Sequence, residues 1–342
     1  MFSTININEA LELNYPFIDV RSPSEYNQGH IPNAVNISLF SDEERKDVGI
    51  VYKNKSEKVA IELGLKIVNP KLDYFVSQSR LIAPDLKLII YCWRGGMRSN
   101  SFAKLLTDNG FDDIKLINGG YKSYRNFVRN VFVQDLKLKI LGGYTGSGKT
   151  MILKELKKTN QQVINLEALA HHKGSAFGSI GQDEQPTNEQ FENILAYQIS
   201  NLDTNKDIWL EDESRNIGKV VIPPELFLKM QNSPLYFINI PKEERAKYLV
   251  MDYSVSDNQL LKQAVIKITK RLGGQNVNEI IALIDQNRLF EAALITLSYY
   301  DKAYHNFMET RNQNSITKIN LSDVNHKRNA KEILKICNIL SK

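Results

Sequence analysis

The sequence predicts an α/β fold made of two parallel-sheet domains. Short apolar segments typical of strands alternate with helical segments along the chain, and this alternation favours strand–helix–strand units. The chain has 342 residues, which exceeds the usual size of one domain. Its 42% hydrophobic and 24% charged residues are ordinary for a globular protein and allow sizeable cores.

The first domain is expected to span residues 1–132. Its predicted strands are PFIDV (16–20), AVNI (34–37), KLIIYC (87–92) and DIKLIN (113–118). Between them lie helical segments such as SFAKLLTDNG (101–110), which a glycine terminates, and a further helix is predicted over 121–132. The next strand begins near Leu136, and the domain boundary is placed there.

The second domain is expected to span residues 136–342. Its predicted strands are LKLKILGG (136–143), QQVINL (161–166), DIWLEDE (207–213), PLYFINI (234–240) and, less clearly patterned, ITKINL (316–321). From about Lys242 onward the rest of the pattern is helical, so the second domain is predicted to end in a helical C-terminal part.

Composition and charge limit the protein's class. The net charge of +5 permits an anionic partner without requiring one. Cys92 and Cys337 are the only cysteines, which excludes a disulfide framework or a zinc cluster and favours a reducing compartment. No apolar run is long enough to span a bilayer, and the N-terminal segment lacks the features of a secretory signal, so we expect a cytoplasmic protein without membrane contact.

The segment IIYCWRGGMRSN (89–100) predicts an anion-binding loop around a thiol. A strand ends at Cys92, a turn containing Gly95 and Gly96 follows, and a helix opens near Arg98. Backbone N–H groups in such a turn, the helix N-terminus, and the charges of Arg94 and Arg98 lower a thiol's pKa and hold an anion. Cys92 is therefore the candidate catalytic residue, and Arg94, Gly95, Gly96 and Arg98 the candidate anion-binding residues.

The motifs DVRSPSEYNQGHIPNAVNI (19–37), YCWRGGMRS (91–99) and LINGGYKSYR (116–125) together resemble a rhodanese domain. The resemblance implies that the cysteine carries a transferred chalcogen, and that Asp19 and Arg21 support the loop without taking part in chemistry. Five residues separate Cys92 from Arg98, one more than in ordinary single-domain rhodaneses. The longer loop resembles that of related dual-specificity phosphatases, so we expect it to accept a chalcogen-substituted phosphate.

A second glycine-rich loop fits the phosphate-binding pattern G-x-x-x-x-G-K-[ST] between a strand and a helix. Its glycines let backbone N–H groups surround phosphate oxygens, its lysine neutralises them, and its threonine hydroxyl is placed for Mg²⁺. The candidate phosphate- or diphosphate-binding residues are Gly143, Tyr144, Thr145, Gly146, Ser147, Gly148, Lys149 and Thr150.

An acid on a second strand is the usual complement of such a loop, as a magnesium ligand or a base. The strand at 207–213 ends in Glu211, Asp212 and Glu213, and we favour Asp212 or Glu213 without choosing between them. If Mg²⁺ binds, Thr150 and Asp212 are its expected ligands. The segment YYDKAYHNFMETR (299–311) mixes basic and aromatic residues that suit either RNA contacts or inward packing of a helix.

The succession YCWRGGMRS, GGYTGSGKT, LEALAHHKGSAFG, EDESRNIG and RLGG resembles the tRNA 2-selenouridine synthase family over essentially the whole chain. The resemblance implies a tRNA-modifying transferase that replaces sulfur by selenium at C2 of the wobble 2-thiouridine in the anticodon arm. Selenophosphate and geranyl diphosphate are the implied co-substrates, an S-geranyl base is the intermediate, and no tightly bound cofactor is expected.

On this resemblance the phosphate loop binds geranyl diphosphate and Cys92 serves the selenium step, either as a Cys–S–Se⁻ carrier or by helping to release selenium from phosphate. Three other hypotheses fit the motifs: a rhodanese-type tRNA sulfurtransferase, a P-loop ATPase or kinase with a regulatory rhodanese domain, and a tRNA-binding module with vestigial sites. The intact Cys92, Lys149 and Thr150 disfavour the last of these.

Overall fold

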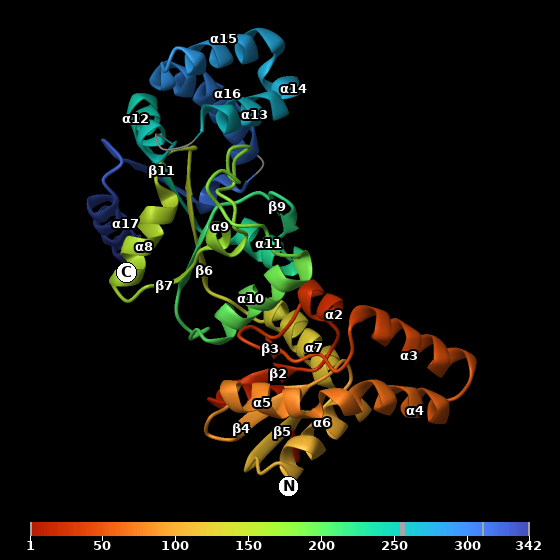
Figure 1. Cartoon of the computed structure of the whole chain (residues 1–342). Helices are drawn as coiled ribbons and strands as arrows, with labels where there is room; N and C mark the ends of the chain where they lie inside the picture. Colours follow the sequence, from red (N-terminus) through yellow and green to blue (C-terminus); the bar gives the residue numbers. More distant parts are fainter. Residues whose placement is uncertain (1, 254–256, 310, 341–342) are drawn as a thin grey trace. The chain divides into compact units, whose positions relative to one another are not determined.

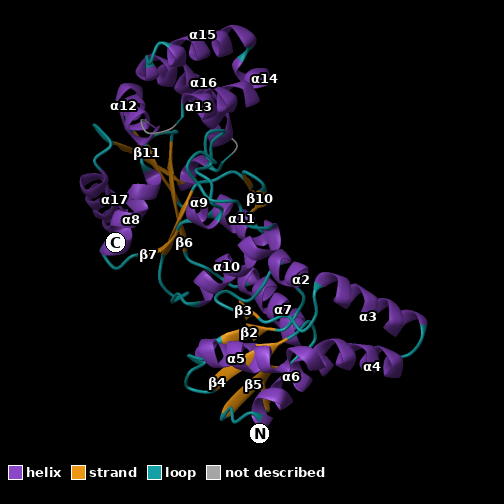
Figure 2. Cartoon of the chain, in the orientation of Figure 1, coloured by secondary structure: helices purple, strands orange, loops and turns teal. Residues whose placement is uncertain are grey.

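The computed structural model describes residues 2–253, 257–309 and 311–340 and confirms the α/β fold class. The chain forms two compact units, one of residues Met1–Val131 with Glu192–Tyr197 and one of Phe132–Phe191 with Gln198–Lys342 (Figure 1). Each unit contains one five-stranded parallel sheet with helices around it (Figure 2). Among the described residues, no helix has both the length and the apolar character that crossing a membrane requires.

The sheet of the first unit has the strand order β1-β5-β4-β2-β3, and all of its pairings are parallel. The four strands predicted from sequence are present, although AVNI contributes only two residues. The strands are β1 (Ser3–Ile5), β2 (Phe17–Asp19), β3 (Val35–Asn36), β4 (Lys87–Tyr91) and β5 (Asp113–Ile117). The edge strand β1 was not predicted, because three residues, two exposed and one partly buried, give no periodic signal.

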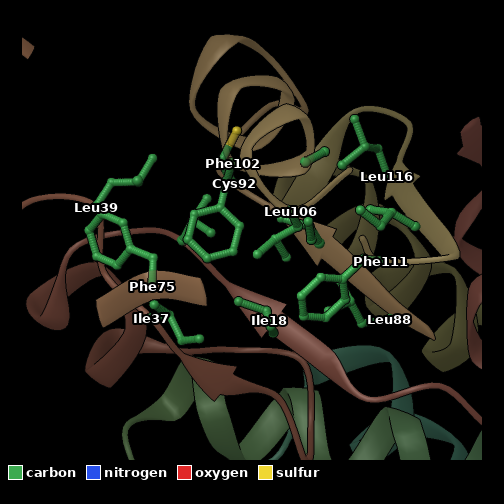
Figure 3. Packing of buried hydrophobic residues seen from close by; sticks show 14 of the residues in the cluster. Ile18, Ile37, Leu39, Phe75, Leu88, Cys92, Phe102, Leu106, Phe111 and Leu116 are labelled. Carbon is green, nitrogen blue, oxygen red and sulfur yellow. The ribbon is translucent and has the colours of Figure 1, made fainter. Parts of the chain in front are cut away.

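The helices of the first unit cover a core made by the central strands. They are α1 (Ile7–Glu12), α2 (Pro23–Gln28), α3 (Asp42–Asn54), α4 (Glu57–Val68), the 3₁₀ helix η1 (Asn69–Lys71), α5 (Leu72–Ile82), α6 (Met97–Asp108) and α7 (Gly120–Val133). Ile18, Leu88, Phe75 and Phe102 lie in this core, and Figure 3 shows Cys92 at its margin. Burial of apolar side chains on this scale is the main stabilising contribution, at about 25 cal/mol per Å².

The sheet of the second unit has the order β12-β11-β6-β8-β7, again all parallel. All five strands predicted from sequence are present, including ITKINL, and a short antiparallel pair was not foreseen. The strands are β6 (Leu138–Gly143), β7 (Gln162–Ile164), β8 (Ile208–Glu211), β11 (Leu235–Asn239) and β12 (Ile316–Asn320), and the pair is β9 (Asn216–Ile217) with β10 (Val220–Val221).

The helices of the second unit fall into two groups. Those around the sheet are α8 (Lys149–Lys158), α9 (Leu166–Leu169), α11 (Pro224–Asn232), the 3₁₀ helix η2 (Gln313–Ser315) and α17 (His326–Leu340). Helix α10 (Asn188–Ser200) contributes Glu192–Tyr197 to the first unit and its other residues to the second. The others are α12 (Lys242–Tyr253), α13 (Asn258–Lys267), α14 (Thr269–Leu272), α15 (Gly274–Asp285) and α16 (Leu289–Glu309). Helices α13 to α16 enclose an apolar cluster of their own, which includes Leu261, Val265, Ile280 and Ile284.

Parallel pairing places the loops that contain the candidate site residues at the carboxyl ends of the strands. Strand β4 leads into Cys92, and strand β6 leads into the phosphate loop. Strand β8 pairs with β6 in a register that sets Glu211 opposite Leu141, so the acids that follow β8 emerge beside that loop. The carboxyl ends of parallel strands are the usual position for ligand sites in such sheets.

Candidate functional site

Cys92 lies directly after β4 and is almost enclosed, with 3% of its surface exposed. Its Sγ is 3.3 Å from the Ser99 hydroxyl, which also lies 3.0 Å from the Gly96 carbonyl, so the one hydroxyl proton can be donated to either acceptor and stabilises the thiolate when it is donated to Sγ. Helix α6 begins at Met97, one residue earlier than predicted, so Ser99 stands in its first turn. The thiol is therefore held between the strand end and a helix N-terminus.

The surroundings of Cys92 favour its ionised form. Burial alone opposes ionisation, but the Ser99 hydroxyl, the Arg98 charge and the backbone N–H groups of Ser99 and Arg94 outweigh it, and the pKa of Cys92 is lowered. Because the thiolate is the reactive form, the loop presents a nucleophile at lower pH than a free cysteine does.

Helix α7 holds the thiol loop from the other side. The N–H of Tyr121 donates to the Cys92 carbonyl at 2.8 Å, and the N–H of Lys122 donates to Trp93 at 3.0 Å. Gly120 has φ of +58°, and a Cβ there would lie 2.3 Å from the Cys92 carbonyl oxygen and 2.5 Å from the Gly95 nitrogen. Only glycine fits this approach, which explains why α7 opens with a glycine at position 120.

The two loop arginines have different environments. Arg98 is partly buried and forms an ion pair with Glu25 at 2.9 Å, which keeps its charge close to Cys92. Arg94 is exposed at the tip of the turn, and Gly96 has open space around it. The loop thus combines a fixed cation with one that is free to reach a bound anion.

Asp19, the last residue of β2, and Arg21 form a buried ion pair. Arg21 binds both Asp19 oxygens, with its closest contact at 2.6 Å, and its guanidinium lies 3.8 Å from the centre of the Tyr121 ring. Both residues are fully buried, so they position the strand ends and do not reach a substrate.

The phosphate loop connects β6 to α8 in the predicted strand–loop–helix arrangement. Lys149 donates to the Gly143 carbonyl at 3.0 Å across the loop. Gly148 has φ of +72°, and a Cβ there would lie 2.8 Å from His326, so this glycine is required for packing as well as conformation. The contact between Lys149 and Gly143 joins the two ends of the loop, so the loop already has a curved shape that can receive an anion.

Arg245, in the first turn of α12, fixes the loop from behind. It is buried, donates to the Thr145 carbonyl at 3.0 Å and forms a bidentate ion pair with Asp301 at 2.8 and 2.9 Å. Sequence reasoning missed this residue, because Arg245 and its partners Thr145 and Asp301 are far apart in the chain. The contact couples the loop's shape to helices α12 and α16.

The three acids after β8 have separate partners. Asp212 is bound by Arg311 at 2.9 Å and by the Tyr304 hydroxyl, so these two residues of the 299–311 segment point inward and support this acid. One Glu211 oxygen accepts the N–H of Leu166 at 2.9 Å. Glu213 is 8% exposed and has no hydrogen-bond partner among the residues that the structure describes.

Glu167 is an additional acid at this site that the sequence did not reveal. Its Oε2 accepts the Thr150 hydroxyl proton at 2.5 Å. A Cβ on Gly174 would lie 2.7 Å from Glu213 and 3.1 Å from Glu167, so both carboxyl groups flank that glycine. The only indications in the sequence were the position of Glu167 after strand β7 and the small residues that follow it.

Burial raises the pKa values of the three acids that follow one another at the end of β8, Glu211, Asp212 and Glu213. Burial first, and then the charge of Glu167, raise the pKa of Glu211 to about 8 and that of Glu213 well above the usual range. Burial also raises the pKa of Asp212, although Arg311 and Tyr304 oppose it. A partly protonated cluster repels an anionic ligand less than three free carboxylates would.

A cavity of about 530 Å³ joins the phosphate loop to an apolar chamber. Its polar end includes Gly146 to Thr150, Glu167, Asp212 and Glu213. Its apolar end is lined by side chains of α13, α15 and α16, among them Leu261, Val265, Ile284 and Ala293. The cavity therefore suits a ligand with an anionic head and a hydrocarbon tail.

The structure places the predicted site residues in three segments, at the carboxyl ends of β4, β6 and β8. Cys92, Arg94, Gly95, Gly96 and Arg98 run from the end of β4 into the first turn of α6, Gly143 to Thr150 run from the end of β6 into the first turn of α8, and Asp212 and Glu213 follow β8. Throughout residues 2–253, 257–309 and 311–340, no group of three or more His, Cys, Asp or Glu side chains is arranged to hold a metal ion.

Known families match both units. The family model for the "tRNA 2-selenouridine synthase AAA domain" matches residues 136–333, and that for the "Rhodanese-like domain" matches residues 6–127. The tRNA 2-selenouridine synthase of Sulfurovum sp. (strain NBC37-1) is 34% identical over 329 residues, which cover 86% of this chain and 88% of that protein. The tRNA 2-selenouridine synthase of Nitrosomonas europaea is 38% identical over 266 residues, covering 73% and 67%.

Among solved structures, the N-terminal domain of a putative ATP/GTP binding protein from Clostridium difficile 630 is 42% identical to this chain. The match covers 36% of this chain and 98% of the chain of that domain, with a TM-score of 0.35.

Proposed function

The chain belongs to the tRNA 2-selenouridine synthase family, and on that premise we propose that it converts the wobble 2-thiouridine of tRNA to 2-selenouridine in two steps. In the first, geranyl diphosphate alkylates the thiocarbonyl sulfur; in the second, selenium from selenophosphate displaces the geranyl thiol. An enzyme with this substrate would act in the cytoplasm. The observation that carries the proposal is the cavity, whose phosphate loop opens into an apolar chamber.

The geranyl step suits the two ends of this cavity. The diphosphate would bind the N–H groups of the loop and Lys149, while the ten-carbon chain would fill the chamber of α13, α15 and α16. The sulfur then forms a bond to C1 as the C1–O bond breaks, diphosphate leaves with the bonding electrons, and N3 of the base loses its proton. A nucleotide would place its polar base against the same apolar wall, which disfavours ATP.

Magnesium, if bound with the diphosphate, would neutralise charge on the leaving group. The Thr150 hydroxyl and the Glu167 carboxylate are adjacent oxygen donors beside the loop and fit this ion, which prefers few carboxylates together with phosphate oxygens. Asp212, which we expected from the sequence as a ligand, already binds Arg311 and Tyr304. We therefore assign the metal-binding role to Glu167 in its place.

The selenium step suits the Cys92 loop, where a low-pKa thiol stands among donors for an oxyanion. In the overall step, HSe⁻ adds at C2 and geranyl thiolate leaves and takes up a proton. The two roles considered for Cys92 differ in the phosphorus product. Attack of water on phosphorus held in the loop gives HSe⁻ and phosphate directly. Attack of the Cys92 thiolate on selenium gives Cys–S–Se⁻ and expels phosphite, and release of HSe⁻ from this carrier then requires an added thiol reductant, two molecules of which are oxidised to a disulfide as the Cys92 thiol is restored.

The test is mass spectrometry of thiolated tRNA incubated with the protein, geranyl diphosphate and selenophosphate, each omitted in turn. We expect the geranyl adduct without selenophosphate and selenium incorporation only when both are present. Cys92→Ala should keep the geranyl step and lose the selenium step, and Lys149→Ala should lose the geranyl step. Loss of both steps in Cys92→Ala, or steady ATP turnover without tRNA, would contradict the proposal. Phosphorus NMR then separates phosphite from phosphate.

A further inference from the structure

Helices α8 and α17 concentrate positive charge. Together they contain eight lysine or arginine residues and two glutamates, a net charge of +6, whereas the whole chain carries +5. The rest of the chain therefore has a net charge of −1. The 25 residues of these two helices therefore carry a local excess of positive charge that can attract a polyanion.

Six exposed lysines on these helices define what we call the α8–α17 basic face: Lys154, Lys157, Lys158, Lys327, Lys331 and Lys335. Their spacing of three and four residues places each set along one side of its helix. Lys158 forms an ion pair with Glu155, and within the described part of the chain none of the other five lysines has an ion-pair partner. Their charges are thus available to an external anion.

The two sets of lysines adjoin each other. Helices α8 and α17 lie side by side (Figure 1) and share one apolar cluster that contains Leu153, Leu156 and Ile333. Glu155 of α8 is under the influence of both helices, because the Lys158 hydrogen bond and then the charges of Lys158 and Lys327 lower its pKa. The basic face is therefore one surface and not two separate edges.

The arrangement is unfavourable for the isolated helices. Lys331 and Lys335 are four residues apart, a spacing at which like charges repel by a few tenths of a kcal/mol. Lys327 and Arg328 lie in the first turn of α17, where the helix dipole disfavours cations. Lys154, on the same face, also lines the cavity of the phosphate loop. Positive charge that the fold does not require thus lies next to the reaction site.

We propose that the α8–α17 basic face binds the phosphodiester backbone of the RNA substrate beside the diphosphate cavity. The inference rests on the proposed function only in taking RNA as the substrate. Each phosphate contact made by a lysine releases counterions, which adds about 0.7 to 0.9 to the slope of log affinity against log salt concentration. Three lost contacts should therefore flatten that slope by about 2 to 3.

The test compares two triple variants of the full chain by fluorescence anisotropy with an unmodified tRNA transcript over a range of salt concentrations. One is Lys157→Glu/Lys331→Glu/Lys335→Glu. The matched control, Lys53→Glu/Lys58→Glu/Lys66→Glu, makes the same charge change at exposed positions of α3 and α4. We expect the first to bind tRNA more than tenfold more weakly at low salt with the flattened slope, and the control to stay within threefold of the unsubstituted protein.

Equal loss in both variants, or unchanged tRNA binding in the first, would overturn the inference. Unchanged tRNA binding combined with lost binding of poly-glutamate would overturn it in favour of an acidic protein partner. Thermal unfolding checks that both variants fold, and calorimetry with geranyl diphosphate checks the cavity separately. If the unsubstituted protein binds tRNA through this face but never geranylates it, the proposed function fails and the RNA-binding face stands.

Discussion

Replacing Gly120 by alanine tests how tightly the thiol loop is held. Gly120 has a left-handed backbone conformation with φ of +58°, and the new Cβ would meet the Cys92 carbonyl oxygen at 2.3 Å and the Gly95 nitrogen at 2.5 Å. The left-handed conformation costs about 1–2 kcal/mol for a residue with a Cβ. Overpacking against rigid backbone adds about 1–3 kcal/mol, so the free energy of unfolding should fall by about 2–5 kcal/mol.

The loop should also move, because the backbone atoms in the way belong to Cys92 and its neighbours. The hydrogen bond from Tyr121 to the Cys92 carbonyl is the first contact to be lost. We expect the thiol to lose its fixed distance to Ser99, which is one cause of its low pKa, and to react more slowly with iodoacetamide near neutral pH. Urea unfolding gives the stability change, and alkylation followed by mass spectrometry gives the thiol reactivity.

Gly110→Ala is the matched control. Gly110 also has positive φ, at +82°, but a Cβ there would meet no atom within 4 Å. It should lose only the conformational part, about 1–2 kcal/mol, and leave the reactivity of Cys92 unchanged. The reasoning is refuted if the two variants lose equal stability, or if Gly120→Ala keeps the unsubstituted rate of alkylation.

Three further predictions follow from the two sites. Ser99→Ala removes a hydroxyl that lowers the pKa of Cys92, so that pKa should rise. The alkylation rate decreases as pH drops through the pKa of the thiol, and this decrease should therefore occur at higher pH in the variant than in the unsubstituted protein. Arg311→Met leaves Asp212 buried without its cation and should cost about 3–5 kcal/mol in urea unfolding, part of which Asp212→Asn in the same chain should restore. Ala293→Leu fills the chamber and should weaken geranyl diphosphate binding tenfold or more in calorimetry, with inorganic diphosphate unaffected.

The sequence was sufficient wherever local pattern determines local structure. Apolar runs bounded by turn residues located every central strand, and the glycine spacing from Gly143 to Gly148 located the phosphate loop between its strand and helix. In both cases the signal lies within a few consecutive residues, and neighbouring backbone is enough to express it. The edge strand β1 and the pair β9–β10 were missed because two or three residues show no period.

The parts that were missed depend on contacts between distant residues. Arg311 reaches Asp212 across 99 positions and Arg245 reaches Thr145 across 100, and no pattern along the chain pairs them. The apolar chamber also depends on distant residues. The sequence of an amphipathic helix such as α13 or α15 predicts an apolar face, but it does not predict which other elements pack against that face. A cavity forms where such apolar faces pack together incompletely, and the sequence of one helix does not show where that occurs.

On the proposed function, that incomplete closure would let the cavity beside the phosphate loop accept a prenyl diphosphate in place of a nucleotide. The loop recognises a charged phosphate group and would hold ATP or a prenyl diphosphate equally well by its N–H groups and Lys149. The proposed choice of a prenyl diphosphate depends on the wall beyond the loop, where Leu261, Val265 and Ala293 contribute apolar surface. A hydrocarbon chain leaving water for the same wall gains about 25 cal/mol per Å² of buried surface. On the proposed function, helices α13, α15 and α16, and not the glycine motif, would therefore determine which diphosphate the site binds.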